Sequence, residues 1–82
     1  MAGESEKIRE HLDNNRVNDA LTIARRYSRN NPSDLKARAL LLEALYSKGE
    51  YAAVQTELNA MQRDGVDHQE LQKLRARFKK RA

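Results

Sequence analysis

The chain has 82 residues, enough for one domain, and a domain of this size buries only about 60% of the surface that its unfolded chain exposes. Hydrophobic residues make up 39% of the chain and charged residues 34%, a balance that favours thin, solvated helical layers over a thick core. Cysteine is absent, which excludes disulfides and thiolate metal sites, and the longest apolar run, residues 39–42, is too short to cross a bilayer. We therefore expect one domain in the cytoplasm.

Two helices separated by a short turn are predicted for the first part of the chain. Ile8 and Leu12 are four residues apart, which places them on one face of a helix over 4–14. The Asn14-Asn15 pair tolerates left-handed backbone, so the chain can reverse its direction there. A second helix over 17–29 follows, and its apolar stripe consists of Val17, Ala20, Leu21, Ile23, Ala24 and Tyr27.

The third predicted helix is the most apolar of the chain. We expect Asn31 to cap it, Pro32 to occupy its first position and Asp34 to lie near its positive end. The helix should then extend to Lys48. Its apolar residues cover more than half of its circumference, so we place it at the centre of the domain, between neighbouring helices. These residues are Leu35, Ala39, Leu41, Leu42, Leu45 and Tyr46.

Two further helices are predicted after this central one. Gly49 ends the third helix, and a fourth begins at Tyr51 and is broken by Asp64-Gly65. Asp67 and Glu70 have the spacing of a capping box, which indicates the start of a fifth helix. The apolar residues at helical spacing are Val54, Leu58 and Met61 in the fourth helix and Leu71, Leu74 and Phe78 in the fifth.

The sequence also repeats itself with a period of about 34 residues, the length of one helical hairpin in stacked repeat proteins. Apolar positions align with apolar positions, and one turn aligns with the other. The aligned pairs are Ile8 with Leu42, Leu12 with Tyr46, Asn15 with Gly49, Val17 with Tyr51, Ala20 with Val54, Ala24 with Leu58, and Tyr27 with Met61.

Several of these residues resemble the tetratricopeptide repeat (TPR) pattern: Pro32, Leu41, Leu45, the Gly49-Glu50-Tyr51 turn and Leu58. The resemblance implies an all-α fold of two antiparallel helical hairpins and a C-terminal capping helix. Within a single domain over 1–82, we expect the first repeat at about 1–31, the second at about 32–65 and the final helix at about 67–80.

Some positions depart from the family pattern. Arg38 stands where the family usually has Trp or another large residue, and Leu42 and Ile8 replace small residues. Tyr27 and Met61 occupy places that are normally Ala. Bulk at these positions changes how closely paired helices approach, so we expect a superhelical angle that differs from the family's usual one.

The resemblance further implies a protein-interaction scaffold, or a small chaperone or assembly adaptor, whose concave surface is lined by the first helix of each hairpin. The polarity of this surface is mixed, which suits a partner helix or extended peptide better than a clamp for a terminal carboxylate. Tyr46 either anchors the partner or completes the core. The candidate partner-binding residues are Arg9, Leu12, Lys36, Ala39, Glu43 and Tyr46.

A basic C-terminal segment offers an alternative function, the binding of nucleic acid or an acidic surface. Residues 73–81 contain six basic side chains and no acidic one. No glycine-rich loop, stacking aromatics or recognition-helix pattern accompanies them, and cations near a helix C-terminus are stabilised by the helix dipole in any case. The residues are Lys73, Arg75, Arg77, Lys79, Lys80 and Arg81.

Catalytic and metal sites are not expected. His11 and His68 lack companions at metal-ligand spacing, and no nucleophile motif or glycine-rich phosphate loop occurs. We therefore predict no enzyme activity, no metal and no cofactor. Because fewer than three repeats rarely bury enough surface to be stable alone, we expect a second copy or another subunit to cover the terminal helices.

Overall fold

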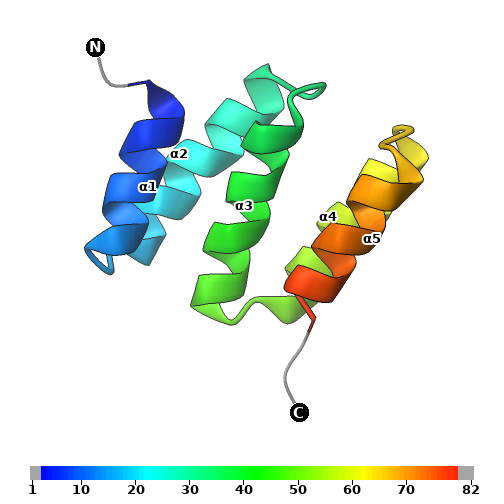
Figure 1. The fold of residues 1–82 in the computed structure, drawn as a ribbon. Coiled ribbons are helices and arrows are strands. Elements are labelled where there is room, and N and C mark those ends of the chain that lie inside the picture. The colour runs from blue at the N-terminus through cyan, green and yellow to red at the C-terminus, as the bar shows by residue number, and fades with distance from the viewer. Residues whose placement is uncertain (1–2, 80–82) are drawn as a thin grey trace.

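The computed structural model describes residues 3–79, which form five α-helices joined by short turns, with no strand in this range (Figure 1). The all-α prediction is confirmed. The helices are α1 (Glu4–Asp13), α2 (Val17–Asn30), α3 (Leu35–Lys48), α4 (Tyr51–Arg63) and α5 (His68–Arg77). The fifth helix ends earlier than the predicted residue 80, which lies outside the described residues together with Arg81.

The helices are arranged in two layers. The α1–α2 and α3–α4 pairs each form an antiparallel hairpin, and α5 packs against α4 (Figure 1). In Figure 1, α2 lies behind α1 and α4 lies behind α5, so that α1, α3 and α5 face the viewer. The Cα atoms extend over 32 × 31 × 16 Å, the dimensions of a thin slab. We call the side formed by α1, α3 and α5 the first-helix face.

The predicted central position of α3 is confirmed by its contacts with α1, α2 and α4. Seven of its residues are buried, whereas α1 buries only Ile8. Burying apolar surface on both sides of one helix is the main source of stability in so small a domain. The largest fully buried side chains are Ile8, Leu42, Val54, Leu58 and Met61.

The two hairpins use repeat-equivalent residues in the same way. Asn15 has φ 59° and Gly49 has φ 82°, so both turns place one residue in the left-handed region. Ile8 and Leu42, also equivalent, are both 0% exposed. The repeat seen in the sequence is therefore a repeat of backbone conformation and of burial.

The predicted start of α3 is wrong in its details. Asp34, rather than Asn31, is the N-cap residue, and its Oδ1 accepts hydrogen bonds from the backbone N–H groups of Lys36 and Ala37. The Asn31 side chain instead donates to the Tyr27 carbonyl at the end of α2. The Asn31 side chain therefore provides a hydrogen bond to a carbonyl in the last turn of α2. Pro32 lies in the turn before α3 instead of at the first position of that helix.

The capping box predicted for α5 is half formed. Asp67 Oδ2 accepts a hydrogen bond of 3.3 Å from the backbone N–H of Glu70, as expected. The Glu70 carboxylate lies 3.6 Å from Lys73 Nζ, one turn further along the helix. An ion pair on the helix surface thus takes the place of the return bond to the cap.

Candidate functional site

One carboxylate connects three helices across the first-helix face. Arg9 of α1 donates two hydrogen bonds to Glu43 of α3, from Nη1 to Oε1 at 2.7 Å and from Nη2 to Oε2 at 2.6 Å. Arg77 Nη2 of α5 lies 3.4 Å from the same Oε2. These contacts join α1, α3 and α5 in a row that we call the charge ladder.

The charge ladder follows the sequence repeat, because positions 9, 43 and 77 are successive equivalents at the family period of about 34 residues. The bidentate bond to Glu43 raises the pKa of the Arg9 guanidinium above its ordinary value. Sequence reasoning named Arg9 and Glu43 as candidates but missed their pairing and the part of Arg77. The equal spacing of the three charged residues was the signal that could have revealed it.

A pocket of about 280 Å³ lies beside the charge ladder, between α1 and α3. Leu40 supplies an apolar wall, and Ser5 and Glu6 line the α1 side. Lys36 and Arg9, both sequence-predicted, also line it. Lys36 is exposed and makes no ion pair with any residue in the range 3–79. The pocket therefore offers an apolar surface beside a cation that is available to a partner.

Three other predicted residues pack into the protein itself. Leu12 and Ala39 are half-buried and lie against the hydrophobic core. Tyr46 is also half-buried, and its ring packs edge to face against Tyr51 and Phe78 with centroids 5.5 Å apart in each case. Its hydroxyl donates a 3.0 Å hydrogen bond to the Lys79 carbonyl. These contacts link the end of α3 to the end of α5.

Most of the basic C-terminal segment that the structure describes has partners within the chain. Lys73 pairs with Glu70, and Arg75 Nη2 donates to the side-chain oxygens of Asn59 and Gln62. Arg77 contacts Glu43 and lies 4.8 Å from the centroid of the Phe78 ring. Lys79 is exposed, and Lys80 and Arg81 lie outside the described residues. Arg75 and Arg77 thus help to hold α5 against α4 and α3.

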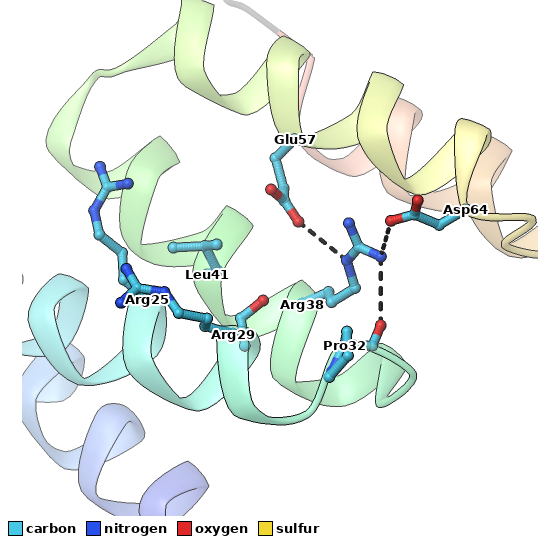
Figure 2. Close-up of a pocket in the computed structure, with 8 residues that line it drawn as sticks. Arg25, Arg29, Pro32, Arg38, Leu41, Glu57 and Asp64 are labelled. Atoms are coloured by element: carbon cyan, nitrogen blue, oxygen red, sulfur yellow. Dashed lines mark hydrogen bonds and ion pairs between the residues drawn. The ribbon is translucent and has the colours of Figure 1, made fainter.

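Arg38, one of the departures from the family pattern, is buried among oxygen atoms beneath α4 (Figure 2). Its Nε donates to Glu57 Oε1 at 3.1 Å, and its Nη1 donates to Asp64 Oδ2 at 2.8 Å and to the Pro32 carbonyl at 3.4 Å. Burial lowers the pKa of Arg38, but the bonds to Asp64 and Glu57 outweigh this effect and raise it above its ordinary value. A polar cluster thus fills a place that a large apolar ring usually takes.

The two histidines are engaged in local contacts. His11 Nδ1 accepts a hydrogen bond of 2.9 Å from Arg16 Nε, and His68 Nε2 lies 3.5 Å from Gln72 Nε2. Within residues 3–79, no three His, Asp or Glu side chains come together in an arrangement that could hold a metal ion. In the same range, no helix has both the length and the apolar character needed to cross a bilayer.

Comparison with known proteins agrees with this geometry. No curated protein and no solved structure matches the chain significantly. A family model described as "Tetratricopeptide repeat" matches residues 11–78, which include the end of α1 and all of α2, α3, α4 and α5. Repeats of this family generally mediate protein–protein interaction and are typically non-catalytic. With two hairpins that share burial, turn conformation and a charge ladder at one spacing, the chain belongs to the tetratricopeptide repeat family.

Proposed function

We propose that this protein is an interaction scaffold, or a small chaperone or assembly adaptor, that binds a helix or extended peptide of a partner protein across the first-helix face. The contact residues would be those predicted from the sequence: Arg9, Leu12, Lys36, Ala39, Glu43 and Tyr46. The chain would act as one domain of two repeats and a final helix.

The observation that supports this proposal best is the pocket between α1 and α3. Its apolar wall at Leu40 can receive an aliphatic side chain, and the exposed Lys36 beside it can pair with a carboxylate. The charge ladder next to it links α1, α3 and α5. Such links reduce the conformational entropy that the face loses on binding.

Site-specific crosslinking tests the proposal. The photo-crosslinking amino acid benzoylphenylalanine is placed at Lys36 in one variant and at Gln55 in another, and each is irradiated in cells of the source organism. Gln55 is also exposed and lies on α4, which is not part of the first-helix face. We expect one protein to be crosslinked from position 36 and not from position 55. Equal products from both positions, or none from position 36, would contradict the proposal.

Nucleic-acid binding through the basic C-terminal segment has less support. Lys73, Arg75 and Arg77 already have partners within the chain, so few of the described cations are available for phosphates. A salt titration with a DNA duplex should therefore show little binding. The cytoplasmic location and the covering of the terminal helices by another subunit stay predictions from the sequence.

A further inference from the structure

A second candidate surface lies between α2 and α4, the two helices behind the first-helix face (Figures 1 and 2). A groove of about 390 Å³ opens there. Arg25, Ser28 and Arg29 line it from α2, and Leu41 of α3 forms an apolar part of its lining (Figure 2). The charge is unevenly distributed across the groove, because its two exposed arginines lie on the α2 side alone.

Arg25 and Arg29 are spaced so that one ligand could contact both side chains. They are four residues apart, so they project from the same face of α2. Neither makes an ion pair with any residue between 3 and 79, whereas the neighbouring Arg26 pairs with Glu4 at 3.7 Å. Two such guanidinium groups beside an apolar floor are suited to a ligand that combines carboxylates with an aliphatic group.

The opposite side of the groove adds a third guanidinium. The side chain of Arg38 is 8% exposed, and its Nε and Nη1 are used by Glu57, Asp64 and Pro32. Its Nη2 makes no hydrogen bond with a described residue. Every fully buried side-chain nitrogen or oxygen in residues 3–79 has a hydrogen-bond partner, so Nη2 cannot be fully buried. Nη2 therefore keeps contact with solvent and can still donate.

We propose that this groove binds a short acidic segment of a partner protein. Carboxylates of the segment would pair with Arg25 and Arg29, and a neighbouring aliphatic side chain would pack over Leu41. The proposal is independent of the function assigned to the first-helix face, because the residues that line the two surfaces are different.

The charges of the groove favour a peptide over a nucleic acid. Three arginines face two carboxylates, and both carboxylates pair with Arg38. Arg25 and Arg29 pair with no carboxylate of residues 3–79, so each can attract an acidic side chain of the peptide. A continuous phosphate backbone would have to pass Glu57 and Asp64, which repel it. The groove residues also include no aromatic ring on which a base could stack.

Selection from a library of random dodecapeptides displayed on phage tests the proposal with the full chain as bait. We expect the enriched peptides to contain at least two acidic residues next to an aliphatic one. The most enriched peptide, labelled with fluorescein, is then measured by anisotropy against the wild type. Replacing its acidic residues by their amides should weaken binding at least tenfold.

Matched variants locate the binding. Arg25→Gln with Arg29→Gln should weaken binding of that peptide at least tenfold, whereas Lys7→Gln with Arg63→Gln, which removes the same charge from exposed positions elsewhere, should leave it within twofold. Lys36→Gln should also leave it unchanged, which separates this groove from the first-helix face. Circular dichroism checks that each variant is folded.

Four outcomes would overturn the proposal. They are no enrichment over a blank support, enrichment of neutral or basic peptides, equal loss in the two matched double variants, and loss only in Lys36→Gln. Binding of a polyuridine oligonucleotide that is lost in the Arg25→Gln, Arg29→Gln variant would show that the groove takes polyanions in general. A change in sedimentation with that variant would show instead that it contacts a second copy.

Discussion

The helices α1 and α3 occupy the same place in the two hairpins, yet they differ in how much they bury. Ile8 and Leu42 are repeat equivalents and both are fully buried, but α1 buries no other residue while α3 buries seven in all. The reason is position in the stack, since α3 contacts helices on both sides and α1 lies at an edge. Repeat-equivalent residues can therefore share a conformation and still differ in what they contribute to stability.

The largest effect is expected at the equivalent core positions. Leu42→Ala should lower the free energy of unfolding by about 4 kcal/mol, and Ile8→Ala by about 2 kcal/mol, because an edge helix relaxes around a cavity more easily than a central one. Urea denaturation followed by circular dichroism at 222 nm measures both. Equal losses would show that α1 is held as firmly as α3.

A second comparison concerns positions 4 and 38, which are also repeat equivalents. Arg38→Ala should cost about 3 kcal/mol, since it leaves Glu57 and Asp64 without their shared cation. Glu4→Ala removes only an exposed pair with Arg26 and should cost less than about 0.5 kcal/mol. Thermal unfolding of the two variants measures the difference. If Arg38→Ala unfolds at the same temperature as the wild type, water must replace the guanidinium between the two carboxylates.

A third comparison concerns Tyr46 of α3 and its repeat equivalent Leu12 of α1, because only Tyr46 has a hydroxyl group that can form a hydrogen bond. Tyr46→Phe keeps the contacts with Tyr51 and Phe78 but removes the bond to the Lys79 carbonyl, so it should cost about 1 kcal/mol. Amide hydrogen exchange should rise mainly at the end of α5. An unchanged α5 with weaker partner binding would assign the hydroxyl to the partner.

The smallest effect is expected at the two turns. Gly49→Asn should cost about 0.5 kcal/mol, because Asn adopts a positive φ at a modest penalty and a new side chain meets open space. Asn15→Gly, the reverse exchange in the first hairpin, should be nearly neutral. Urea denaturation of the single variants and of the double exchange measures these values. A loss above 2 kcal/mol at Gly49 would show that the turn has a further constraint.

The helices themselves could be predicted from the sequence, because spacing and turn residues are local signals. Gly49 and Asn15 marked the turns, and the apolar stripe of α3 indicated its central place. The N-cap residue of α3 was predicted wrongly, because Asn31 and Asp34 are both good N-cap residues. In the structure Asp34 caps α3, while the Asn31 side chain donates to the carbonyl of Tyr27, four residues earlier at the end of α2.

The candidate site was predictable only in part. The residues of the first-helix face follow from the repeat, and Arg38 was recognised as unusual. Its partners Glu57 and Asp64 come from α4 and the turn after it, so their meeting depends on how the second hairpin closes. Spacing alone also gave no indication that Arg25 and Arg29 share a groove with Leu41, which comes from another helix.

The alternation of charge along the ladder sets a rule for building longer arrays from this sequence. Arginine, glutamate and arginine follow one another at equivalent places, so the next place would require an acid. Insertion of a single hairpin would set two like charges side by side, which is unfavourable. Insertion of hairpins in pairs would preserve the alternation, so an engineered solenoid based on this chain should be extended by an even number of hairpins.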